Sequence, residues 1–168
     1  MMYIERWWGE YIGGTDDTYT LIDYFVSREF ELDIPAEINV KNILRDFQLT
    51  NAWEIKDLRQ TKDIYFINDN GHRHDIGCAI NLLMDVTAII LECQKNGKVH
   101  LTDLDGGIMD KDAVISLKAE KEELALLKKM LGDFIHHPLS YDLAELCPED
   151  DMCEIAKQCK EIMTELNM

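Results

Sequence analysis

Two Asn-Gly pairs, Asn70-Gly71 and Asn96-Gly97, constrain the fold more than any other feature of this sequence. A two-residue β-hairpin with a type I′ turn needs φ > 0 at both turn positions, and Asn-Gly adopts this conformation readily. The first pair follows the strand-like run Ile64-Tyr65-Phe66-Ile67, and the return strand is expected to start at His72. Each pair therefore predicts an antiparallel hairpin.

The second hairpin is expected to join residues 87–95 to residues 98–102. Its turn sets the cross-strand pairs Lys95–Lys98, Cys93–His100 and Leu91–Thr102, so that one face of the ladder is buried and the other is solvated. Residues 113–117 are expected to add one more short strand. The predicted sheet is antiparallel and built on hairpins.

Residues 3–12 are predicted to form a strand rich in aromatic residues, ended by Gly13-Gly14. Because successive side chains of a strand point to opposite faces, Trp7 and Trp8 are not expected to pack against the same layer. We expect one of them in the core and the other half-exposed. Tryptophan and tyrosine are enriched at interface hot spots, and either tryptophan is a candidate for this role.

Helices are predicted on both sides of this sheet in the sequence. Thr15 caps the first helix, with Asp16 and Asp17 at the positive end of its dipole, and Asn39 caps a short second helix after Pro35. A third helix ends before Pro138, and the last begins at Pro148. Their expected buried stripes are Leu21, Ile22 and Phe25; Val40, Ile43, Leu44 and Phe47; Leu124, Leu127, Leu131 and Phe134; and Met152, Ile155, Cys159, Ile162 and Leu166. The prediction is a single α+β domain over residues 1–168, with helices flanking the sheet at both ends of the chain.

Charge excludes some classes of partner. The chain has 33 acidic and 17 basic side chains among 168 residues, a formal net charge of -16. Such a field repels a phosphate backbone and an anionic membrane surface, and attracts a basic macromolecule. We therefore expect no direct nucleic-acid or membrane partner. Plain solubility is the alternative explanation of the acidity.

The first residues contain no cationic run followed by an apolar stretch, and the most apolar window, residues 79–93, is too short to span a bilayer. Five cysteines, an odd number, fit free thiols in a reducing compartment. Cytoplasmic localisation is therefore expected. Cys147, Cys153 and Cys159 recur every six residues, without the close pairs of a structural zinc site, and no metal or cofactor is expected there.

Common catalytic and ligand-binding motifs are missing. Asp103-x-Asp105 fails as a calcium loop because Gly107, Ile108 and Val114 occupy positions that need a ligand, glycine and glutamate. There is no G-x-S-x-G, P-loop, G-x-G-x-x-G or H-E-x-x-H sequence. We therefore predict no catalytic residue.

His72 and His74 are the best candidates for an enzymatic alternative, a small hydrolase or metal-dependent enzyme. On a strand they share one face, and Asp75 or Cys78 lies near them in sequence. The competing interpretation is a solvated hairpin tip. The pair His136-His137 is explained by the preference of a helix C-terminus for a partial cation.

The excess of negative charge is concentrated in two stretches. Residues 5–37 contain nine acidic side chains against Arg6 and Arg28, a local charge of -7, and residues 142–154 contain six acidic side chains and no base. Self-repulsion within each stretch costs stability, and a cationic partner would relieve it.

The aromatic and acidic start, "WGEYIGGTDDTYTLIDY", together with the size, the acidity and the lack of a catalytic signature, resembles small cytosolic immunity proteins of bacterial contact-dependent inhibition and polymorphic toxin systems. These families share no motif, so no site residue is carried over. The resemblance implies binding to a cognate toxin domain, often a basic nuclease, with occlusion of its active site or substrate groove.

The resulting hypothesis is a binding protein, and an acidic adaptor subunit is an alternative that differs only in its partner. Carboxylates steer association and an aromatic side chain supplies binding energy. The predicted partner-binding residues are Trp7, Trp8, Tyr11, Asp16, Asp17, Asp142, Glu145, Glu149, Asp150 and Asp151.

Overall fold

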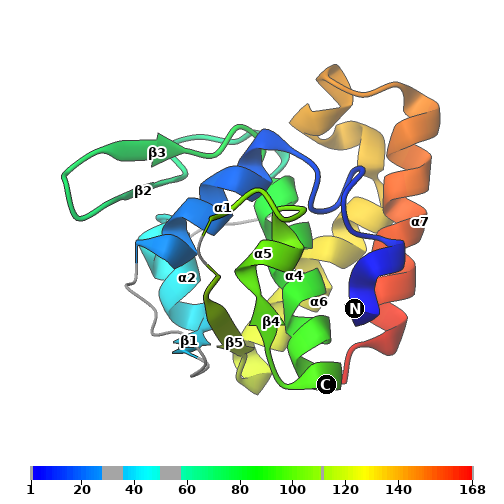
Figure 1. Ribbon diagram of the computed structural model, residues 1–168. Coiled ribbons are helices and arrows are strands. Elements are labelled where there is room, and N and C mark those ends of the chain that lie inside the picture. Colours follow the sequence, from blue (N-terminus) through cyan, green and yellow to red (C-terminus); the bar gives the residue numbers. More distant parts are fainter. Residues whose placement is uncertain (1, 28–35, 50–57, 111, 168) are drawn as a thin grey trace.

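The computed structural model describes residues 2–27, 36–49, 58–110 and 112–167 (Figure 1). Pro35, which is expected in the loop before the second helix, lies outside these ranges. In chain order the elements are η1 (Tyr3–Arg6), α1 (Asp16–Val26), β1 (Ala36–Asn39), α2 (Val40–Asp46), β2 (Tyr65–Ile67), β3 (Arg73–Asp75), α4 (Ala79–Asn96), β4 (Val99–His100), α5 (Leu101–Leu104), β5 (Val114–Lys118), α6 (Lys121–His136), η2 (Pro138–Ser140), η3 (Asp142–Glu145) and α7 (Glu149–Glu165). The α+β class is confirmed.

Helix α4 forms the centre of the molecule. Every residue from Ala79 to Cys93 is buried, because α1, α6, α7, β5 and η1 all pack against this helix. A helix that is apolar on all sides is the type that a protein buries completely. Figure 1 shows α4 enclosed between α1 and α5 on one side and α6 and α7 on the other. No helix among the described residues is long and apolar enough to cross a membrane.

The second predicted hairpin is wrong, because residues 87–95 belong to α4. Gly97 takes the left-handed conformation, with φ of 80°, and ends the helix by donating its N–H to the Cys93 carbonyl oxygen at 2.8 Å. The pairs Lys95–Lys98, Cys93–His100 and Leu91–Thr102 therefore do not form as strand pairs. Asn-Gly occurs both in hairpin turns and at helix C-termini, and here residues 79–96 form a helix.

The main sheet is mixed, which corrects the prediction of a purely antiparallel one. Its strand order is β1-β5-β4, with β1 parallel to β5 (Ala36 opposite Ile115) and β4 antiparallel to β5 (Val99 opposite Ile115). The expected strand at residues 113–117 corresponds to β5. Ile115 and Leu117 on this strand are buried, and β5 packs against α4.

The first predicted hairpin is confirmed as the separate pair β2–β3, with Phe66 opposite His74. Its turn differs from type I′. The Asn68 N–H donates to the His72 carbonyl oxygen at 2.9 Å and the Gly71 N–H to that of Asn68 at 2.9 Å, and of the two turn residues only Gly71 has a positive φ. This is a three-residue loop ending in a left-handed glycine, and β3 consequently starts at Arg73 rather than His72.

The predicted strand over residues 3–12 is also wrong. The segment forms η1 and a series of turns, and its buried residues Ile4, Trp7 and Ile12 do not alternate. Buried carboxylates of α4 accept its backbone donors in place of a strand ladder: Glu92 accepts from the Ile4 N–H at 3.4 Å and Asp85 from the Gly13 N–H at 2.8 Å.

The helices predicted from capping residues and apolar stripes are present. Thr15 caps α1 through the Thr18 N–H, α6 ends two residues before Pro138, and Pro148 immediately precedes α7. Asn39 occupies the N-cap position of α2, although its side chain makes no capping hydrogen bond. The residues of all four expected stripes are buried.

Candidate functional site

The start of α1 separates the two aspartates of the opening sequence. Asp16 is exposed, whereas Asp17 is buried and accepts hydrogen bonds from the N–H groups of Gly77 (2.7 Å) and Cys78 (3.0 Å) and from the Asn81 amide (3.0 Å). The Asp17 carboxylate therefore fixes α1 against the beginning of α4. Both aspartates lie in the first turn of α1, where negative charge is favourable, but only Asp16 is available to a partner.

Asp142 approaches the same point from the other acidic stretch. It accepts a hydrogen bond from the Thr61 N–H at 2.9 Å, and it lies close enough to Cys78 to interact with its thiol. Burial, followed by the nearby carboxylates of Asp142 and Asp17, raises the pKa of Cys78 to about 12. Cys78 is thus an unreactive thiol that marks where the two acidic stretches meet.

A second contact joins the two stretches near the start of α7. The Tyr11 hydroxyl donates to Asp151 Oδ1 at 3.0 Å. This hydrogen bond, with added burial and the nearby charges of Asp151, Glu10 and Glu154, raises the pKa of Tyr11. Three carboxylates therefore surround one tyrosine at this point.

The two tryptophans hold the N-terminal segment in place. Trp7 is buried and its indole N–H donates to Glu161 Oε2 on α7 at 2.8 Å. Trp8 is half-buried and donates to the Leu104 carbonyl oxygen at 2.9 Å. A Cβ on Gly13, which has φ of 76°, would lie 2.1 Å from the Trp8 ring, so glycine is required for this packing.

We call the resulting region the acidic end. It lies at the top of Figure 1, where α1 and α7 begin and the segment carrying η2 and η3 connects to α7. Its carboxylates come from Glu10, Asp16, Asp17, Asp142, Glu145, Glu149, Asp150, Asp151 and Glu154. Asp16, Glu145, Glu149 and Asp150 are exposed, and Asp142 and Asp151 are half-buried.

Three large exposed side chains accompany these carboxylates. Leu146 is 75% exposed between Glu145 and the start of α7, Leu139 is 51% exposed, and Tyr19 is 50% exposed one turn after Asp16. Reasoning from the sequence did not single out the two leucines. The available signal was an apolar residue between prolines, outside every amphipathic stripe.

The first acidic stretch does not form one surface. Glu5 is exposed on η1, and Glu37 lies on β1 with its carboxylate 3.8 Å from the Lys118 ammonium group. Glu29, Glu31 and Asp33 fall outside the described residues. Of this stretch, only the part around residues 10–17 contributes to the acidic end.

The residues of the enzymatic alternative do not converge. His74 stacks on Phe66, with ring centroids 4.8 Å apart, and its Nε2 lies 3.1 Å from the Asn68 amide nitrogen. His72 is exposed, and Asp75 pairs with Arg73 at 2.8 Å. Among the residues that the structure describes, no group of three or more His, Cys, Asp or Glu side chains is arranged to hold a metal ion.

One carboxyl inside the fold has a strongly altered proton affinity. Asp85 on α4 is buried, and this burial raises its pKa from 3.8 to about 7. Hydrogen bonds from the Thr18 hydroxyl (2.6 Å) and the Gly13 N–H (2.8 Å) act in the opposite direction, and the nearby Asp17 adds to the rise. Asp85 is enclosed in the structure and serves to hold α1 and the N-terminal segment on α4.

Comparison with known proteins gave one finding. Residues 3–166 match the family described as immunity protein 68. Neither the curated proteins nor the solved structures contained a significant match.

Proposed function

Because this chain belongs to the immunity protein 68 family, we propose that it uses its acidic end to bind a basic cognate toxin and block the toxin's active site. An immunity protein neutralises its toxin by binding and is not itself an enzyme, in agreement with the binding protein predicted from the sequence. The family match supports a toxin as partner. The surface and the charge of the toxin are the proposed elements.

The observation that carries the proposal is the pairing of exposed charge with exposed apolar surface at one end of the molecule. The exposed residues Glu145, Glu149 and Asp150 lie within four positions of Leu146, whose side chain is 75% exposed. Carboxylates attract a cationic protein over roughly a Debye length and orient it during encounter. An apolar side chain that enters a pocket of the partner then slows dissociation.

The predicted partner-binding residues divide into two groups on this basis. Asp16, Glu145, Glu149 and Asp150 are exposed and contact the toxin directly, together with Leu139, Leu146 and Tyr19. The others are not offered to the toxin directly: Tyr11, Asp17, Asp142 and Asp151 shape the acidic end from beneath or at its edge, whereas Trp7 and Trp8 hold the N-terminal segment through Glu161 and the Leu104 carbonyl oxygen.

Occlusion follows from the chemistry of a basic substrate groove. A toxin that cleaves nucleic acid must present cations to the phosphate backbone. A row of carboxylates complements the same cations, so the immunity protein and the substrate compete for one groove. A toxin inhibited in this way loses substrate binding and catalysis together.

The test uses the toxin encoded beside this chain, or the one that co-purifies with it from its host. Glu149→Lys combined with Asp150→Lys should lower the association rate constant about 10-fold or more at low salt, and by less at about 0.15 M salt. Leu146→Ala should instead raise the dissociation rate about 5- to 10-fold. Stopped-flow mixing measures both rates.

Asp69→Lys with Asp110→Lys is the matched control, since both residues are exposed, neither belongs to the acidic end, and the change in net charge is the same. If the control slows association as much as the acidic-end variant does, only net charge matters and the proposed surface is wrong. The same conclusion follows if neither variant changes the rate.

A further inference from the structure

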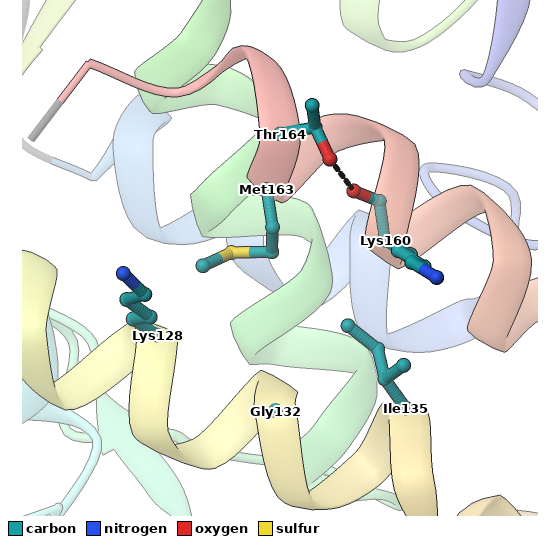
Figure 2. Close-up of a pocket in the computed structure, with 6 residues that line it drawn as sticks. All are labelled: Lys128, Gly132, Ile135, Lys160, Met163 and Thr164. Atoms are coloured by element: carbon teal, nitrogen blue, oxygen red, sulfur yellow. Dashed lines mark hydrogen bonds between the residues drawn. The ribbon is translucent and has the colours of Figure 1, made fainter.

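A groove runs between α6 and α7 on a different part of the surface from the acidic end. It has a volume of about 360 Å³, and Figure 2 shows it with Gly132 on its floor and the side chains of Ile135 and Met163 extending into the space between the helices. Lys128 of α6 and Lys160 of α7 lie toward its two ends. The groove is thus apolar in the middle and cationic at the ends.

Gly132 keeps this groove open. It lies in the interior of α6, and a Cβ built on it would meet no other atom within 4 Å. Glycine is unfavourable inside a helix, and neither a positive φ nor close packing requires it at this position. Any larger side chain here would project into the groove. The sequence therefore gives up helix stability at the one position where a side chain would fill the space.

The lysines around the groove are available to a partner. Lys128 and Lys160 are exposed, as are Lys121 and Lys157 further along the same two helices. Within the described residues, none of these four ammonium groups lies within 4.0 Å of a carboxylate. Unpaired cations are notable in a chain with 33 acidic and 17 basic side chains.

We propose that this groove binds an acidic segment of another protein, which places a bulky apolar side chain over Gly132 and carboxylates against Lys128 and Lys160. Charge complementarity selects this occupant. A second copy of the chain in a symmetric contact would bring the same lysines together and would add the repulsion of two bodies of charge -16. Met163 suits such a site, because a flexible thioether adapts to different apolar partners.

The groove and the acidic end therefore select opposite charges. A basic toxin can occupy the acidic end while the groove stays free for an acidic segment, whether of the same toxin or of a different protein. The inference rests on α6 and α7 alone, and it stands or falls independently of the proposed toxin-binding surface.

The test selects binders from a random peptide library displayed on phage, with the intact wild-type protein as bait and the Gly132→Leu variant as counter-selection. Enriched peptides are expected to carry one bulky apolar residue flanked by Asp or Glu. A synthetic copy of the most enriched peptide should shift the NMR signals of Gly132, Ile135 and Met163. Lys128→Glu with Lys160→Glu should weaken its binding about 10-fold or more.

Lys41→Glu with Lys98→Glu is the control for net charge, because neither lysine lines the groove. This variant should keep peptide affinity within about 2-fold of wild type, since salt screens charges that do not contact the peptide. Thermal unfolding is used to check that each variant is folded. Gly132→Ala is a second variant, which obstructs the groove less and places a favourable residue in the helix. Enrichment of peptides without acidic residues, or NMR shifts away from the groove, would overturn the proposal. So would sedimentation showing self-association that Gly132→Leu abolishes, since the occupant would then be a second copy.

Discussion

Replacing Asp85 by asparagine should remove a pH dependence that this one side chain imposes on stability. Burial raises the pKa of Asp85 from 3.8 to about 7 in the folded protein. Between these two values the folded state holds a proton that the unfolded state has released, so stability falls as pH rises. The contribution is fully present below pH 3.8 and is lost as pH passes through about 7.

The magnitude follows from the two pKa values. Each pH unit between them lowers the free energy of unfolding by about 1.4 kcal/mol. From pH 5.5 to pH 8 the loss from Asp85 is therefore about 2 kcal/mol, since the effect levels off near pH 7. Asparagine has the same shape and stays neutral, and its oxygen can still accept the Gly13 N–H.

The assay is urea unfolding followed by tryptophan fluorescence at several pH values between 5.5 and 8, a range above the sequence pI of about 4.5. The informative quantity is the difference in free energy of unfolding between Asp85→Asn and wild type, because the other titrating groups cancel in it. This difference should shift by about 2 kcal/mol in favour of the variant as pH rises. A difference that stays constant across the range would refute the reasoning, because it would mean that the hydrogen bonds from Thr18 and Gly13 outweigh burial and keep the pKa of Asp85 below the range.

Three further changes test other parts of the structure. Asp17→Ala should lower the free energy of unfolding by about 3 kcal/mol in urea titrations, because it leaves the Cys78 N–H and the Asn81 amide without their acceptor. Gly132→Ala should raise it by about 1 kcal/mol, seen as a higher melting temperature, because alanine favours the helix and the added methyl meets nothing. Burial acts to raise the pKa of Asp133, but hydrogen bonds from Arg59 and Tyr141 lower it overall, so its stabilising effect is present at neutral pH and lost in acid. Asp133→Asn should therefore be less stable than wild type at pH 7, and the two free energies should converge below about pH 4, as acid titrations at fixed urea would show.

Local chemistry made the helices at the chain ends predictable. Thr15 as an N-cap, Pro148 before the acidic turn of α7, and apolar residues at helical spacing each depend only on near neighbours in sequence. The hairpin at β2–β3 was predictable for the same reason. The details of its turn were not, because the Asn68 side chain accepts the N–H groups of Asn70 and His72 and stabilises a longer loop.

The central helix and the mixed sheet depended on contacts between distant residues. A helix buried on every side, such as α4, has no polar face and hence no helical period for a sequence pattern to reveal. The parallel pairing of β1 with β5 joins residues 36–39 to residues 115–118, and no local signal specifies such a pairing. The N-terminal segment was misread as a strand because its backbone partners are the side chains of Asp85 and Glu92.

The candidate site was predictable as composition but not as geometry. Counting charges identified both acidic stretches, whereas their meeting at Cys78 and at Tyr11 depends on the tertiary fold. Burial then separated residues that looked alike in sequence, with Asp16 exposed and Asp17 enclosed. Leu146 became visible only as a side chain that the core does not cover.

The hydrogen bonds from Trp7 and Tyr11 to α7 have a consequence for biosynthesis. They join residues 154 and 140 positions apart in the chain. During translation these two aromatic side chains remain without their acceptors until residues 151–161 have left the ribosome. A nascent chain that stalls before this point cannot form either hydrogen bond, so the N-terminal segment gains these two contacts with α7 only when synthesis has passed that helix.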